Sequence, residues 1–130
     1  MGRGSGRDWV NQTVAPGVAE RVRFTGRLDR DQMAALYRDA DLTLNPSRVD
    51  NMPVSVLEAM ACGVPVVTTD VGGIPFLVSH ERTALLVPAD APQAMADAAL
   101  RVLDDAPLAA VLRQAGLEEV RRYAWSAVRN

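Results

Sequence analysis

The sequence predicts an α/β fold with a mostly parallel sheet and flanking helices. Short stretches rich in β-branched residues alternate with amphipathic segments, and Gly, Pro, Asn or Asp residues separate them. The continuous apolar run Val64–Thr69 is typical of a buried parallel strand. Strands and helices that alternate at short intervals favour parallel pairing, because each helix returns the chain to the same end of the sheet.

The elements follow from spacing and from turn residues. Weak helical spacing predicts a short helix within Trp9–Ala19, and alternation predicts a strand at Arg21–Gly26. Asp29 and Gln32 have the spacing of a capping box, which predicts that a helix begins there. The other predicted elements are strands at Asp41–Asn45, Val64–Thr69 and Thr83–Pro88, and helices at Val54–Cys62 (ended by Gly63), Asp90–Leu103 (with Asp90 as N-cap) and Leu108–Tyr123.

Composition indicates one globular domain and excludes several classes of function. The chain has 130 residues, of which 48% are hydrophobic and 23% charged, and this length leaves little room for two domains. A net charge of −2 and only six aromatic residues argue against binding to nucleic acid. The single cysteine, Cys62, excludes an internal disulfide and is typical of a reducing, cytoplasmic location. No apolar run is long enough for a transmembrane segment, and Met1–Arg7 has no hydrophobic signal region.

The stretch from Asn45 to Met60 is the strongest candidate for a functional site. Glu58 is the only charged residue between Val54 and Cys62, so we expect it to be half-buried among apolar neighbours. A carboxylate in such a place must be paired, neutralised or open to a cleft. Asp50 lies eight positions earlier, in the turn before the same helix. Two acids beside a helix N-terminus suit a ligand that carries hydroxyls and a phosphate, because the first-turn N–H groups can bind the anion.

Three loops should meet at the carboxyl ends of the predicted strands, where ligands bind in open α/β sheets. They are Gly26–Arg27, Pro46–Val54 and Asp70–Gly73. We therefore expect these loops to converge on one cleft, in which a half-buried Glu58 would contact a ligand.

These residues also carry a family likeness. The pattern Asp50-x7-Glu58, continued by Ala59–Val67 and Gly72-Gly73, resembles the nucleotide-sugar half of retaining glycosyltransferases with the GT-B architecture, glycosyl transferase group 1 or family 4. The likeness runs from about Gly2 to Trp125. It implies that residues 1–130 form a single, truncated nucleotide-sugar-binding domain with a Rossmann-like sheet, part of a GT-B C-terminal domain.

The resemblance assigns roles residue by residue. Glu58 matches the acid that binds the ribose hydroxyls of the donor, and Asp50 matches the acid that lies against the transferred sugar, where the family usually has Glu. Pro53 has no N–H, so an anion there would use the amide of Val54 or Ser55. The other implied contacts are Asn51, Met52, Pro53, Val54 and Ser55 with the sugar hydroxyls and diphosphate, and Gly26 and Arg27 beside the nucleotide base.

The implied reaction transfers a sugar from a nucleotide-diphospho-sugar to a saccharide or lipid acceptor, as in polysaccharide biosynthesis, with no metal or other cofactor. The N-terminal acceptor domain of such an enzyme and the basic pair that clamps the diphosphate have no counterpart here, so we expect a fragment that is inactive alone. The parent protein would be cytoplasmic, with the inner membrane face as one option. Its truncation would expose a sheet edge and apolar surface, which predicts self-association.

Plainer interpretations stand beside these. Glu58 could pair with Arg48 or Arg27, and Asp50 could make an Asx turn with its own backbone. Phe76 stands where much of the family has Glu, which weakens any role for the Gly72-Gly73 turn. The chain could also be a stand-alone nucleotide-binding module without catalysis, or part of a nucleotide-sugar epimerase of the same architecture.

Overall fold

The computed structural model describes residues 17–49 and 54–129, and side chains as far as Arg122. The chain divides into two compact units, Met1–Arg30 and Asp31–Asn130. In the first unit a short 3-10 helix, η1 (Ala19–Arg21), precedes residues that belong to no strand, so the predicted strand at Arg21–Gly26 is wrong. Alternation does give extended backbone at Val22, but a strand also requires a neighbour that accepts its hydrogen bonds. Most of the predicted helix within Trp9–Ala19 lies outside the described residues.

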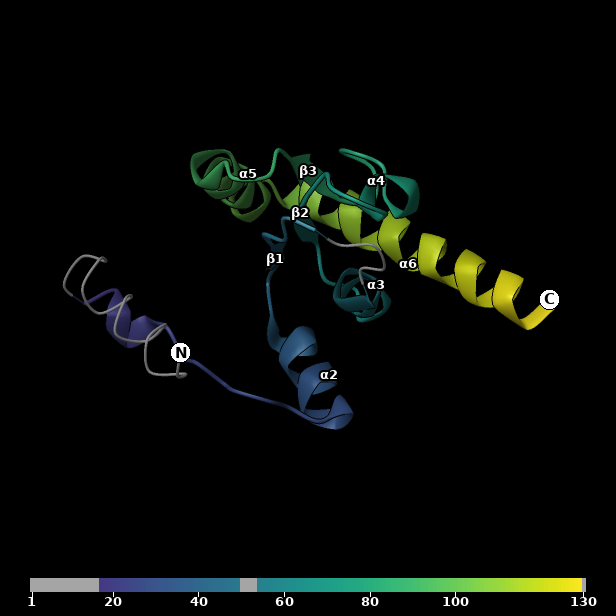
Figure 1. Ribbon diagram of the computed structural model, residues 1–130, viewed down its shortest axis with the longest axis horizontal. Helices are drawn as coiled ribbons and strands as arrows, with labels where there is room; N and C mark the ends of the chain where they lie inside the picture. The colour runs from purple at the N-terminus through teal and green to yellow at the C-terminus, as the bar shows by residue number, and fades with distance from the viewer. Residues whose placement is uncertain (1–16, 50–53, 130) are drawn as a thin grey trace. The chain divides into compact units, whose positions relative to one another are not determined.

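A parallel sheet organises the second unit (Figure 1) and confirms the predicted α/β class. Its three strands are β1 (Thr43–Asn45), β2 (Val66–Thr69) and β3 (Leu85–Val87), in the order β1-β2-β3. Leu44 pairs with Val67 and Thr68 pairs with Leu86, and both ladders are parallel. The helices are α2 (Arg30–Asp39), α3 (Val54–Ala61), α4 (Ile74–Leu77), α5 (Pro92–Asp104) and α6 (Ala106–Arg129).

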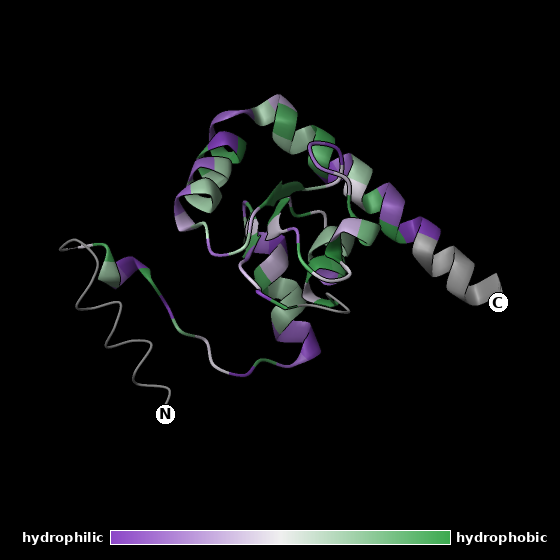
Figure 2. Cartoon of the chain, turned by 45° about the horizontal axis from the view of Figure 1, so that its top comes forward, coloured by the Kyte–Doolittle hydropathy of each residue, from purple (hydrophilic) through white to green (hydrophobic). Residues whose placement is uncertain are grey.

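The central strand β2 is buried along its whole length, as its β-branched sequence predicts. Its residues alternate between two clusters of the core, because successive side chains point to opposite faces of a sheet. Val66 packs with residues of α2, α3 and α4, whereas Val67 packs with residues of α5 and α6. Figure 2 shows the apolar strands at the centre of these surrounding helices.

Helix α3 ends as the sequence predicts. Gly63 has a φ of +73°, which lies in the left-handed region that favours glycine. Its N–H donates to Met60 O over 3.0 Å, and the Val64 N–H donates to Ala59 O over 3.0 Å. These two bonds form a Schellman motif. Arg113 Nε also donates to Gly63 O over 3.1 Å, which joins α6 to the end of α3.

The start of α5 differs from the prediction. The helix begins at Pro92 with Ala91 as its N-cap, and no side chain caps it, so Asp90 is not the predicted cap. Proline is favoured at the first helical position, and this preference places the N-cap one residue later than the acid. Asp105 takes the capping role at α6 instead, where its Oδ1 accepts from the Leu108 N–H over 3.0 Å. No helix in the described part of the chain is long and apolar enough to cross a membrane.

Candidate functional site

Helix α3 has one buried face and one solvent-exposed face. Val56, Ala59 and Met60 are at most 1% exposed. Glu58 lies on the opposite stripe with Ser55 and is exposed, so the predicted half-burial of Glu58 is wrong. The apolar sequence around Glu58 does not enclose it, because the residues three and four positions away share its face and its immediate neighbours do not. The carboxylate is therefore open to a ligand.

Tyr37 joins α2 to the first turn of α3. Its side chain is 9% exposed, and its hydroxyl donates to Ser55 O over 3.4 Å. Burial raises the pKa of Tyr37 above its ordinary value, and the nearby charges of Glu58 and Cys62 raise it further. The carboxylate of Glu58 is therefore close enough to the buried phenol of Tyr37 to affect its pKa.

Hydrogen bonds between polar side chains connect the ends of β1 and β2. Asn45 Nδ2 donates to Thr68 Oγ1 over 3.0 Å, and Ser47 Oγ donates to Asn45 Oδ1 over 2.9 Å. Thr69 Oγ1 donates to Ser47 O over 2.6 Å. Thr68 and Thr69 are at most 2% exposed. The segment that leaves β1 is therefore attached to the end of β2 by side-chain hydrogen bonds.

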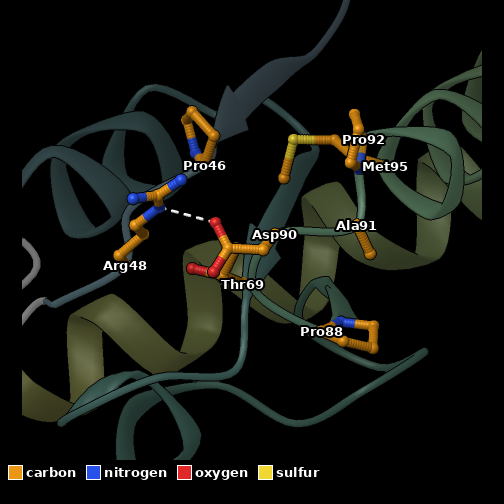
Figure 3. A pocket seen from close by; sticks show the side chains of 8 residues that line it. All are labelled: Pro46, Arg48, Thr69, Pro88, Asp90, Ala91, Pro92 and Met95. Atoms are coloured by element: carbon orange, nitrogen blue, oxygen red, sulfur yellow. Dashed lines mark ion pairs between the residues drawn. The ribbon is translucent and has the colours of Figure 1, made fainter.

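A pocket of about 220 Å³ lies at the same carboxyl edge (Figure 3). An ion pair crosses it, with 2.5 Å between Arg48 Nε and Asp90 Oδ1. This contact contradicts the alternative in which Arg48 pairs with Glu58. The pocket is lined by Pro46 and Arg48 after β1, Thr69 at the end of β2, and Pro88, Asp90, Ala91, Pro92 and Met95 between β3 and α5.

The structure brings only some of the predicted site residues together. Val54 and Ser55 lie on the exposed start of α3, in the same stripe as Glu58. Gly26, with a φ of +65°, and the exposed Arg27 belong to the first unit, so the convergence of the three loops stays a prediction. The predicted residues Asp50, Asn51, Met52 and Pro53 lie outside the described residues.

Metal-ligating side chains do not gather in the part of the chain that is described. No group of three or more His, Cys, Asp or Glu side chains among those residues could hold a metal ion. The imidazole of His80 is exposed, and its Nδ1 accepts from the Leu86 N–H over 2.9 Å. Cys62 is partly buried and packs against the core cluster around α3.

Sequence reasoning gave two residues at this edge a different role, Arg48 as a partner of Glu58 and Asp90 as an N-cap, and it assigned no site role to Thr68 and Thr69. The rule that ligands bind at the carboxyl ends of parallel strands pointed to the loops after β1 and β2, and it applies equally to the loop between β3 and α5. The polar pair Thr68-Thr69 at the end of an otherwise apolar strand was the available signal for the hydrogen bonds.

Comparison with known proteins gives the family context of these features. The family model described as "Glycosyl transferases group 1" matches residues 1–105. A D-inositol 3-phosphate glycosyltransferase of Jonesia denitrificans is 38% identical over 109 residues, which are 84% of this chain. The chain spans about a quarter, 26%, of that relative's length.

Solved structures share the fold. Sucrose-phosphate synthase of Thermosynechococcus elongatus matches with a TM-score of 0.84 and 35% identity, over 92% of this chain and 29% of that protein. The Anabaena protein HepE in complex with UDP matches with a TM-score of 0.80 and 25% identity, over 92% of this chain and 32% of HepE.

Proposed function

Since this chain belongs to the glycosyl transferases group 1, we propose that it supplies the nucleotide-sugar-binding part of a retaining GT-B glycosyltransferase. The whole enzyme would transfer a sugar from a nucleotide-diphospho-sugar to a saccharide or lipid acceptor, in polysaccharide biosynthesis in the cytoplasm. The domain that holds the acceptor would come from the part of the enzyme that the chain does not span. The UDP complex of HepE supports a uridine nucleotide as the first donor to test.

The exposure of Glu58 is the observation that carries this proposal. The acid lies on the solvent-facing stripe of α3, in the second turn of the helix that follows β1. Arg48, an alternative partner for Glu58 in the sequence, pairs with Asp90 instead. An exposed carboxylate on a fixed helix can accept hydrogen bonds from two vicinal hydroxyls, which is the chemistry of a ribose.

The other roles follow the same helix. The free N–H groups at the start of α3, at Val54 and Ser55, would bind the diphosphate, and Asp50 would act beside the transferred sugar. The donor would need no metal, because helix N–H groups and basic side chains stabilise the departing diphosphate. Gly26 and Arg27 would lie beside the base. Positioning of the donor against the acceptor would then supply most of the rate enhancement.

Calorimetric titration of this chain with UDP and with GDP tests the proposal. Wild type should bind one of the two nucleotides, and Glu58→Ala should weaken that binding by about tenfold to a hundredfold, the range of one hydrogen bond to a charged group. Glu118→Ala is the matched control, because Glu118 is an exposed helical glutamate on α6. Its affinity should equal that of wild type.

Two outcomes would contradict the proposal. Binding that survives Glu58→Ala unchanged would remove Glu58 from the ribose site. Absence of binding by the wild type, for both nucleotides, would show that this chain does not form a donor site by itself.

A further inference from the structure

We propose that Thr69 is a positioning residue, which with Asn45 and Thr68 fixes the segment leaving β1 and thereby sets the affinity for the nucleoside diphosphate. The inference rests on the proposed function for its ligand, and on the hydrogen bonds at the carboxyl edge for its mechanism. The segment is defined as residues 45–48. Asp50 follows Arg48 by two residues in the sequence, and α3 begins at Val54.

The segment is held from both faces of the central strand. Thr68 and Thr69 are consecutive in β2, so their side chains point to opposite faces of the sheet. Thr68 Oγ1 accepts from Asn45 Nδ2 over 3.0 Å on one face. Thr69 Oγ1 donates to Ser47 O over 2.6 Å on the other. The chain that leaves β1 is therefore clamped across the end of β2.

Ser47 closes the network. Its hydroxyl donates to Asn45 Oδ1 over 2.9 Å, while its carbonyl accepts from Thr69. Asn45 is thus held in one amide orientation, with Oδ1 accepting and Nδ2 donating. Every polar side chain in the network has a partner, and the two threonines are almost completely buried. Satisfied buried networks specify one local geometry, because any other arrangement leaves a polar group without a partner.

Thr69 is the residue to test, because removing one partner of a partly buried hydrogen bond leaves the other partner unsatisfied. A valine at this position keeps the β-branched shape and removes only the hydroxyl, so the Ser47 carbonyl loses its donor. The pocket beside Thr69 gives the segment room to move, because Pro46 and Arg48 line the same space. The ion pair between Arg48 and Asp90 is an exposed contact and cannot hold the segment alone.

The experiment compares Thr69→Val, Thr69→Ser and Thr83→Val with wild type. Thr83 is the matched control, since it is 1% exposed and its Oγ1 accepts from the Ser79 N–H over 2.7 Å in a different loop. Two quantities are measured: amide hydrogen exchange in peptides covering residues 44–49, and the calorimetric affinity for UDP and GDP.

Thr69→Val should speed exchange in residues 44–49 and weaken nucleotide binding, each by about threefold to tenfold, the range of one hydrogen bond. Thr69→Ser should keep the wild-type exchange rate and the wild-type affinity, because serine keeps the hydroxyl. Thr83→Val should change neither, although it removes a comparable buried hydroxyl.

The outcomes separate this inference from the proposed function. Unchanged exchange in residues 44–49 of Thr69→Val would overturn the clamp itself. Faster exchange with wild-type affinity would overturn the positioning role while leaving the donor site intact. A wild type that binds neither nucleotide would overturn the proposed function and the positioning role together, and the exchange data would still decide on the clamp.

Discussion

Two glutamates on helices that pack together, Glu58 on α3 and Glu119 on α6, have opposite environments. Glu58 lies in an apolar stretch of sequence and is exposed. Glu119 lies in the charged stretch Glu118–Arg122, yet its side chain is only 13% exposed. Its Oε2 atom is buried, 3.9 Å from Arg82 Nη2 and 3.5 Å from Arg122 Nη1, within ion-pair distance but without hydrogen-bond geometry.

The difference shows what decides burial of an acid. A residue in a helix has different neighbours in the sequence and on the helix surface. Only the residues three and four positions away share its face. Tertiary contacts then decide whether that face is covered. Glu119 faces the turn that carries Arg82, whereas Glu58 shares its stripe with exposed residues. We therefore expect Glu119 to matter for stability and Glu58 for binding.

The largest effect on stability should come from removing both arginines. Arg82→Ala with Arg122→Ala leaves the mostly buried carboxylate of Glu119 without a counter-charge. We expect the free energy of unfolding to fall by about 1–2 kcal/mol, below the cost of breaking a fully buried pair, because the arginine side chains are 51% and 65% exposed. Glu58→Ala should stay within about 0.5 kcal/mol of wild type, as surface substitutions do. Urea unfolding followed by circular dichroism measures both values.

A second pair of exposed arginines provides the control for lost charge. Arg38→Ala with Arg121→Ala removes the same net charge from exposed positions on α2 and α6. Its unfolding free energy should remain near that of wild type. An equal loss in the two double variants would mean that net charge, and not the environment of Glu119, causes the effect.

The fold could be predicted wherever local chemistry and packing agree. The β-branched run at β2 and the glycine after α3 each specify one conformation, and the structure confirms both. The strand predicted at Arg21–Gly26 is wrong, because alternation concerns one segment and does not show whether a second strand lies beside it to pair with. The prediction of Asp90 as N-cap is wrong because Pro92 fixes the start of α5.

The candidate site was harder to predict than the fold. The position of Glu58 on α3 followed from the sequence, but its exposure did not, since exposure depends on which face of α3 the sheet and α6 cover. The pair between Arg48 and Asp90 joins residues that are 42 positions apart (90 − 48), and no local pattern indicates such a contact. The same is true of the bond from Thr69 to Ser47.

A smaller effect should link Glu58 to Tyr37. Burial, first, and the charge of Glu58, second, raise the pKa of Tyr37 in the folded chain above the ordinary value of 10.0. The stability that this difference contributes is complete below pH 10.0 and is lost as the pH rises through the raised pKa. Glu58→Gln removes the nearby negative charge, so it should lower the pKa of Tyr37 in the folded chain, which makes this loss smaller and completes it at a lower pH.

Phenolate absorbance measures this pKa directly. The chain has two tyrosines, so a Tyr123→Phe background leaves Tyr37 as the only phenol. Glu118→Gln serves as the control, because it removes an equal charge from a different helix. The two glutamine variants should titrate differently, and identical titration curves would show that Glu58 exerts no measurable field on Tyr37.

The smallest effect should come from the ion pair across the pocket, which is the exposed counterpart of the pair at Glu119. The side chains of Arg48 and Asp90 are 79% and 61% exposed. A double-mutant cycle with Arg48→Gln and Asp90→Asn should give a coupling free energy of at most about 0.5 kcal/mol. Asparagine is the suitable replacement, because Asp90 has a φ of +58° and asparagine tolerates the left-handed region.

Salt separates this pair from the hydrogen bonds beside it. The coupling between Arg48 and Asp90 should vanish at about 1 M salt, where the screening length falls to roughly 3 Å. The effect of Thr69→Val on hydrogen exchange in residues 44–49 should persist there, since its bond to Ser47 joins two neutral groups and the Thr69 side chain is buried. A coupling free energy well above 1 kcal/mol that survives high salt would instead make the ion pair a principal restraint on the segment that leaves β1.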